Sequence, residues 1–96
     1  MKLRILPSAI TDLSDGFRFY ETQINGLGSY YLESLFSDVD SLKLYAGIHQ
    51  KVFGYHRLLS KRFPYAIYYR KDADTVYIVA VLDCRRDPGW IREKLG

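Results

Sequence analysis

The most restrictive feature of this sequence is the run Thr-Val-Tyr-Ile-Val-Ala-Val-Leu at residues 75–82, which is almost wholly apolar. A strand with one solvent-exposed face alternates apolar and polar residues, whereas an unbroken apolar run of this length is typical of a strand buried on both faces. The run therefore predicts the central strand of a small sheet. Because the chain has only 96 residues, we expect residues 1–96 to form a single domain around that sheet.

Two amphipathic helices are predicted in the first half of the chain, and neither can bury its apolar stripe alone. Ser8 is the expected N-cap of the first helix and Asn25-Gly26 its stop, and the apolar stripe between them is Ile10, Leu13, Phe17, Tyr20 and Ile24. Ser29 is the expected N-cap of the second and Gly47 its stop, with the stripe Leu32, Leu35, Phe36, Val39 and Leu42. The short connection between them predicts an antiparallel helical hairpin.

The remaining elements complete an α+β fold. Lys2 to Leu6 reads as a short N-terminal strand, and residues 55–59 and 65–70 read as two further strands rich in residues that favour sheets. A polar turn at residues 71–74 joins the second of these to the central strand as an antiparallel hairpin. Asp87-Pro88 opens a short C-terminal helix as N-cap and N1. The predicted order is β-α-α-β-β-β-α, with a three-stranded antiparallel sheet in the second half.

Several functional classes are excluded by what the chain lacks. Cys84 is the only cysteine, so no internal disulfide and no zinc site built on paired cysteines can form. There is no apolar run long enough to cross a membrane, no signal-peptide core and no Gly-rich phosphate loop. We therefore expect a cytoplasmic protein that needs no metal and no cofactor and does not bind membranes.

Charge is divided unequally along the chain. Residues 1–50 contain 4 Lys and Arg against 6 Asp and Glu, a net charge of −2, whereas residues 51–96 contain 10 against 5, a net charge of +5. Five of the nine tyrosines also lie in the basic half. Basic groups interleaved with aromatic rings suit phosphate binding and base stacking, and they suit an acidic partner protein equally well. The candidate binding residues are Arg57, Lys61, Arg62, Arg70, Arg85, Arg86 and Trp90.

The second half also carries a family resemblance. The segments Lys-Arg-Phe-Pro-Tyr-Ala-Ile-Tyr-Tyr at 61–69, Asp-Thr-Val-Tyr-Ile-Val-Ala-Val at 74–81 and Cys-Arg-Arg-Asp-Pro at 84–88 resemble the RelE/ParE superfamily of type II toxins, in particular members described as plasmid stabilisation proteins. The order of elements matches along nearly the whole chain. The resemblance implies a RelE/ParE-like fold, a toxin function and a cognate antitoxin that forms a hetero-oligomeric complex with the toxin.

The two branches of the superfamily imply different targets. RelE-like members are ribosome-dependent mRNA endonucleases, and in that case His56, Arg57, Arg85 and Arg86 would be the catalytic residues. ParE-like members are associated with inhibition of DNA gyrase through protein contact. This chain departs from the nuclease pattern because Ala66 stands where an arginine is expected and Trp90 where a tyrosine or histidine is expected. Without those groups an acid or a base for phosphodiester cleavage is missing.

We therefore favour a ParE-like growth inhibitor that acts on gyrase and is neutralised by its antitoxin, with the RelE-like mRNA endonuclease as the alternative. No sequence-specific DNA binding is expected of this chain alone. Each candidate also has a purely structural interpretation. His56 on a strand is more often structural than catalytic, Arg85 or Arg86 can simply pair with Asp83 or Asp87, and Trp90 is expected in the core first.

Overall fold

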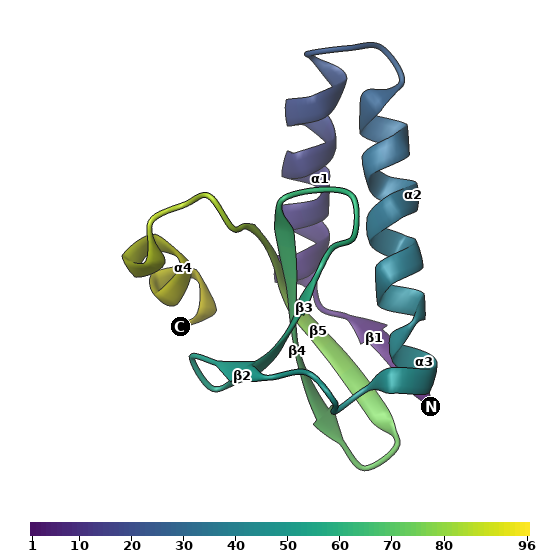
Figure 1. Cartoon of the computed structure of the whole chain (residues 1–96), viewed down its shortest axis with the longest axis vertical. Helices are drawn as coiled ribbons and strands as arrows, with labels where there is room; N and C mark the ends of the chain where they lie inside the picture. Colours follow the sequence, from purple (N-terminus) through teal and green to yellow (C-terminus); the bar gives the residue numbers. More distant parts are fainter.

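The computed structural model of the chain describes residues 1–96. A sheet of five strands carries a helical hairpin on one face and a short C-terminal helix on the other (Figure 1). The elements in chain order are β1 (Lys2–Ile5), α1 (Pro7–Glu21), α2 (Leu27–Asp40), α3 (Leu42–Tyr45), β2 (Lys51–Val52), β3 (Tyr55–Leu59), β4 (Tyr65–Asp72), β5 (Thr75–Asp83) and α4 (Pro88–Leu95). None of the helices is long and apolar enough to span a membrane.

The α+β class and the order of the main elements are confirmed, and the sheet is larger than predicted. Its strand order is β1-β5-β4-β3-β2, in which β1 runs parallel to β5 and the other neighbours are antiparallel. The two-residue strand β2 and the single-turn helix α3 carry no periodic pattern long enough to predict. The middle strand is β4, so β5 lies one position from the centre, between β1 and β4. The predicted turn at 71–74 is shorter, because β4 continues to Asp72 and only two residues connect it to Thr75.

The apolar run is unbroken because its side chains enter cores on both faces of the sheet, and a bulge in β5 changes their alternation part-way. The register of β4 with β5 shifts between Tyr68 and Tyr69, where Tyr68 pairs with Ala80 and Tyr69 pairs with Ile78. Val79 is the extra residue, so the alternation of β5 changes phase there. Before the bulge Val76 and Ile78 face the helical hairpin; after it Val81 faces the hairpin, while Ala80 and Leu82 face the other side.

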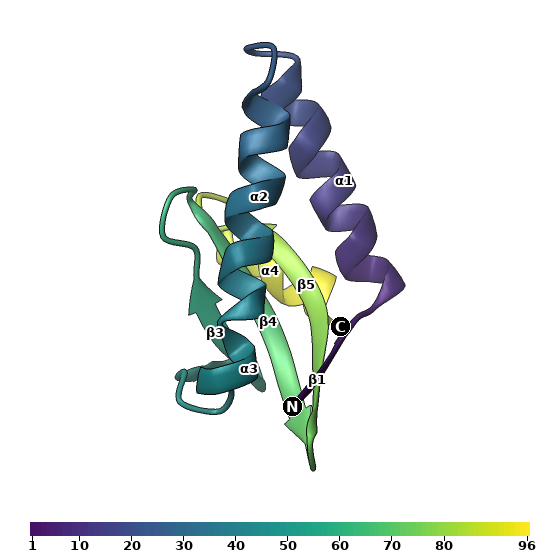
Figure 2. The same ribbon diagram turned by 90° about the vertical axis from the view of Figure 1, so that its right-hand side faces the viewer.

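Each face of the sheet has its own core. The helical hairpin covers the larger one, which contains Ala9, Leu13, Tyr20, Tyr31, Leu35, Val39, Leu42, Tyr65, Ile67, Tyr69, Val76, Ile78 and Val81. Helix α4 covers the smaller one, which contains Ala66, Tyr68, Ala80, Leu82 and Ile91 (Figure 2). Ala66, at the position where the nuclease pattern has an arginine, is completely buried in this second core.

Two of the three predicted N-caps are wrong. Helix α1 begins at Pro7 with Leu6 as N-cap, and the Ser8 hydroxyl instead donates to the Val79 carbonyl at 2.7 Å. Helix α2 begins at Leu27, before Ser29, with Gly26 as its N-cap residue, and the Glu21 carboxylate at the end of α1 accepts the backbone N–H groups of Gly26 and Gly28 there. The third prediction is confirmed: the Asp87 carboxylate accepts the N–H of Gly89 at 3.0 Å, with Pro88 at N1.

The helical hairpin is packed through its smallest residues rather than through the whole predicted stripe. Ala9, Gly16 and Gly28 are buried between α1 and its neighbours, and a Cβ at Gly28 would lie 2.7 Å from the Phe17 carbonyl oxygen. Part of each predicted stripe is left outside this close contact, although other members, Leu13, Tyr20, Leu35, Val39 and Leu42, are buried. Ile10 is 55% exposed and Ile24 is 64% exposed, against the expectation that both would be buried.

Candidate functional site

The predicted catalytic residues do not converge on one site. His56 and Arg57 are consecutive on β3, so their side chains lie on opposite faces of the sheet. His56 pairs with Tyr69 on the hairpin side, and Arg57 pairs with Tyr68 on the α4 side. One phosphate group cannot contact both side chains while the sheet is intact.

His56 instead belongs to a packed cluster with His49 and Tyr69. Its ring stacks on Tyr69 with a centroid separation of 5.0 Å, and its Nδ1 bonds to the His49 carbonyl at 2.6 Å. The Tyr69 hydroxyl accepts the Gly47 N–H at 2.9 Å and contacts His49 Nδ1 at 2.5 Å. Burial, and after it the nearby His56, lowers the pKa of His49. These contacts fit a structural role, in which the cluster fixes the segment between α3 and β2 against the sheet.

Four cations lie beside aromatic rings: Arg57 and Arg70 on the side of the sheet that α4 covers, and Arg86 and Lys94 just before and on α4 at the cleft towards α1. We call Arg57, Arg70, Arg86 and Lys94, with their aromatic neighbours Tyr68, Tyr77 and Trp90, the basic face. The Arg70 guanidinium lies 4.1 Å from the centroid of Tyr77, and Arg86 lies 4.5 Å from the Trp90 centroid. Lys94 approaches the same indole at 5.6 Å. Cation–π contacts of this kind hold the charges in place while leaving them partly open to an anionic partner.

Arg57 is the half-buried member of the basic face. Burial raises the pKa of the Tyr68 hydroxyl, and the Arg57 guanidinium beside it opposes that rise. Burial also raises the pKa of the nearby Cys84 thiol, again against the effect of Arg57. A thiol that stays protonated at neutral pH is neither a nucleophile nor a base. The basic face therefore offers positive charge but no group that exchanges a proton near pH 7.

The other predicted binding residues differ in whether their charge is already engaged in an ion pair. Arg85 makes a two-pronged ion pair with Asp83, with Nε–Oδ1 and Nη2–Oδ2 distances of 2.9 and 2.8 Å. Hydrogen bonding from Arg85 holds the pKa of Asp83 below its ordinary value, so the pair stays charged. One of the two structural interpretations of Arg85 is thus observed, the pairing with Asp83. Lys61 and Arg62, by contrast, are exposed in the β3–β4 connection and make no ion pair.

A cleft of about 300 Å³ separates α1 from the end of β5 and from α4. Arg86, Trp90 and Lys94 form one wall, and Asp12 and Asp15 of α1 stand on the opposite wall. The Asp12 carboxylate accepts the Val81 N–H at 3.0 Å, at a point where β1 has ended and β5 has no neighbouring strand on that side. Burial raises the pKa of Asp12, and the Val81 hydrogen bond partly offsets that rise.

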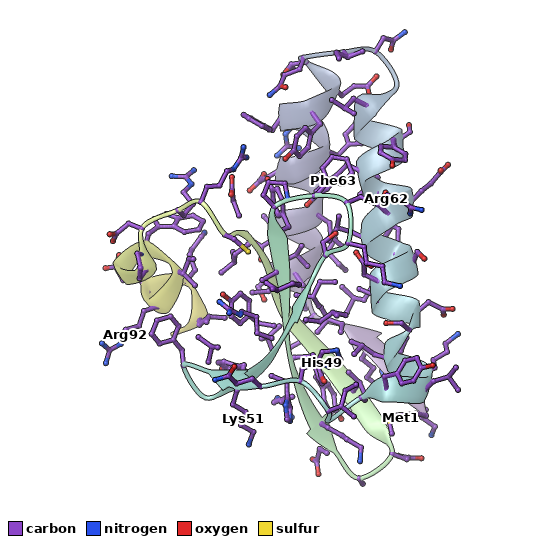
Figure 3. The ribbon with its side chains drawn as sticks, viewed as in Figure 1. Met1, His49, Lys51, Arg62, Phe63 and Arg92 are labelled. Carbon is purple, nitrogen blue, oxygen red and sulfur yellow. The ribbon has the colours of Figure 1, made fainter.

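Charge patterning finds three of the four cations of the basic face but misses the fourth, Lys94. Lys94 follows Trp90 by four residues on α4, which is the spacing that brings side chains together on a helix, so it was detectable. Arg92 also lies on α4 (Figure 3), where it lines a pocket together with Tyr55, Arg70 and Leu95. No group of three or more His, Cys, Asp or Glu side chains is arranged to hold a metal ion.

A second candidate surface is an apolar groove on the outside of the helical hairpin. This groove has a volume of about 490 Å³ and is lined by Ile5, Ile10, Leu13, Ser14, Phe17, Leu32 and Phe36. Phe36 is 46% exposed, although its place in the helical stripe predicted burial. The residues that close packing of the two helices turns outward therefore form a continuous apolar surface, which is typical of a protein interaction site.

A family model and a solved structure that match this chain both carry the name of the same toxin–antitoxin system. A family model described as "ParE toxin of type II toxin-antitoxin system, parDE" matches residues 3–88. A solved structure described as "Chromosomal ParDE TA system from P. aeruginosa" superposes with a TM-score of 0.76 and 21% sequence identity, covering 84% of this chain and 92% of that chain. At that identity the likeness concerns the fold. Curated protein sequences gave no match to the chain.

Proposed function

The chain belongs to the ParE toxin family and is a toxin of a type II toxin–antitoxin system, and from this premise we propose that it inhibits growth by binding DNA gyrase. The proposal has two parts. The basic face contacts the target, and a cognate antitoxin occupies the apolar groove and neutralises the toxin. Both encounters would take place in the cytoplasm.

The observation that carries the first part is the composition of the basic face. Its four cations are held beside aromatic rings, but both histidines of the chain lie on or beside the hairpin side of the sheet. Cleavage of RNA by attack of the 2′-hydroxyl needs a base and an acid near the scissile phosphate. A surface with positive charge and no proton-exchanging group is better suited to binding an acidic protein surface than to hydrolysis.

The apolar groove supports the second part. It is long enough to follow α1 from Ile10 to Phe17, about two turns, and Leu32 and Phe36 of α2 line its other side. An amphipathic helix can place its apolar side chains between such residues. Antitoxin tails that are disordered when free and fold on binding would fit this surface.

The target is tested by comparing two assays on the same purified toxin. We expect inhibition of gyrase supercoiling, with mRNA left intact in a translation extract. Arg86→Ala removes an exposed cation of the basic face and should weaken the inhibition at least about tenfold, because charged contacts at interfaces often contribute 2 kcal/mol or more. Lys43→Ala is the matched control, since Lys43 is an exposed cation on α3 that pairs with Asp40 away from the basic face. Ribosome-dependent mRNA cleavage that Arg86→Ala abolishes would refute the gyrase proposal and support the endonuclease.

The antitoxin part has a separate test. Phe36→Asp puts a charge into the apolar groove at a position already half exposed, so the toxin should fold and remain toxic while co-expressed antitoxin no longer protects the cell. Leu44→Asp is the control, because Leu44 is 81% exposed on α3 and outside the groove. If the antitoxin protects equally well against the Phe36→Asp toxin, the groove is not its binding site.

A further inference from the structure

One edge of the sheet is left open along the second half of β3. Strand β2 is only two residues long and pairs with Tyr55 and His56, so β3 continues beyond the end of its neighbour. Figure 2 shows β3 at the outer side of the sheet. Beyond His56 the outer side of this strand therefore faces no other strand.

The hydrogen-bond pattern fixes which backbone groups point outward there. The N–H of Ser60 donates to Tyr65 across the β3–β4 connection at 2.9 Å, and the N–H of Arg57 donates in the opposite direction, to Gln50 at 3.0 Å. Backbone groups alternate in direction along an antiparallel strand, so Leu59 has the same phase as Arg57. The N–H and C=O of Leu59 and the C=O of Arg57 are therefore directed away from the sheet. Three backbone groups are available to an added strand.

The surroundings of this edge are strongly basic. Residues 51–71 contain six Lys and Arg and no Asp or Glu, and Arg57, Lys61 and Arg62 flank the open backbone groups. One acid of another element, Asp38 of α2, lies beside this edge; it is buried and accepts the Ser60 hydroxyl at 2.7 Å. Leu59 itself is 54% exposed, so the edge presents an apolar side chain between positive charges.

We propose that this edge captures an extended acidic segment of a partner protein as an additional strand beside β3. The backbone groups supply the pairing and the cations select the charge of the segment. A second copy of the chain fits poorly, because pairing β3 with another β3 would set Arg57, Lys61 and Arg62 against the same charges. The edge shares no residue with the apolar groove, so this inference does not depend on what fills the groove.

The test uses labelled toxin and a short synthetic peptide in which glutamate alternates with valine, capped at both ends. Titration followed by NMR should shift the Leu59 amide resonance in a saturable way and slow its hydrogen exchange. Binding should weaken as salt is added, since it depends on exposed charges. The same peptide with lysine in place of glutamate should bind at least about tenfold more weakly.

Leu59→Pro is the decisive variant. It removes an N–H that makes no bond within the sheet, and proline is tolerated on edge strands, so the fold should be retained. Peptide affinity should fall about tenfold or more, whereas the control Leu59→Ala, which keeps the N–H, should bind nearly as well as the wild type. Lys61→Glu with Arg62→Glu provides a second test that leaves the backbone unchanged, and it should also reduce the affinity.

Three outcomes would overturn the proposal. The first is the absence of any peptide-induced shift at millimolar concentration, which would mean that the cations only protect the edge against pairing. The second is equal binding of the glutamate and lysine peptides. The third is unchanged affinity in a folded Leu59→Pro protein, which would place the peptide elsewhere.

Discussion

Replacing Gly16 by alanine should destabilise the protein, although alanine is the better helix former. Gly16 lies in the middle of α1 and is buried against Tyr31 of α2. A Cβ at this position would overlap the end of the Tyr31 ring, and even the more distant Cε2 atom would be only 2.8 Å away. Either the ring or the helix must move.

The ring has little freedom to move. Tyr31 is completely buried, and its centroid lies 5.1 Å from that of Tyr65, 5.2 Å from Phe63 and 5.3 Å from Tyr20. Overpacking of a filled core costs about 1–3 kcal/mol, and the gain in helix propensity for Gly→Ala offsets at most about 1 kcal/mol of that cost. We therefore expect Gly16→Ala to lower the free energy of unfolding by about 1–2 kcal/mol.

Urea denaturation measures this change directly. With a slope of about 2 kcal/mol per molar urea, the midpoint should fall by about 0.5–1 M. Thr11→Ala is the control, because Thr11 is exposed on the same helix, where alanine should be neutral or slightly stabilising. The Tyr31 hydroxyl has no hydrogen-bond partner, so adding Tyr31→Phe to Gly16→Ala should restore part of the loss. A Gly16→Ala protein as stable as the wild type would refute the close packing that we infer between α1 and α2.

Three further predictions concern other parts of the fold. Since the pKa of His49 is lowered in the folded state, the unfolded state binds a proton on His49 more readily. The free energy of unfolding should therefore decrease as the pH falls below about 6.5. Urea titrations at pH 7.5 and 5.5 measure this decrease, and His49→Gln should remove part of it. Asp12→Ala should lower the free energy of unfolding by about 1–2 kcal/mol, because it leaves the Val81 N–H without its acceptor. Asp12→Asn keeps an acceptor and removes a charge that burial disfavours, so it should be at least as stable as the wild type at pH 7. Trp90→Ala should lower the free energy of unfolding by about 2–3 kcal/mol through lost packing of α4, with a correspondingly lower thermal midpoint.

Periodicity predicts the elements of this fold well where one pattern dominates. The stripes of α1 and α2 and the β-rich segments of β3 and β4 each repeat over several residues, so their type and order follow from the sequence. The contacts at the starts of α1 and α2 do not follow from the local sequence. The Ser8 hydroxyl of α1 donates to Val79 of β5, and the N–H groups at the start of α2 donate to Glu21 of α1. Local rules cannot anticipate a partner supplied by tertiary structure.

The burial of the helical stripes illustrates the same limit. Spacing predicts that Ile10 and Phe36 share a face with core residues, and they do lie next to the core. Which edge of a broad stripe is buried depends on how closely the helices approach, and that depends on Gly16 and Gly28. An exposed apolar groove was therefore not predictable from the helical spacing alone.

For the candidate site, composition identifies the charges but not their partners. Residues Arg70 and Arg86 are on the basic face, as the clustering of cations and tyrosines suggested. The pairing of Arg85 with Asp83 depends on the bend after β5, which no motif specifies. That His56 and Arg57 point in opposite directions does follow from strand alternation, once the strand itself is accepted.

The position of Trp90 makes it an intrinsic fluorescence probe. It is the only tryptophan in the chain, and it is half-buried between Arg86 and Lys94 at the mouth of the cleft. All tryptophan emission therefore comes from the junction between α4 and the sheet. A partner that displaces either cation or lifts α4 would change the intensity or wavelength of that emission, so contact with a target can be followed without attaching a dye.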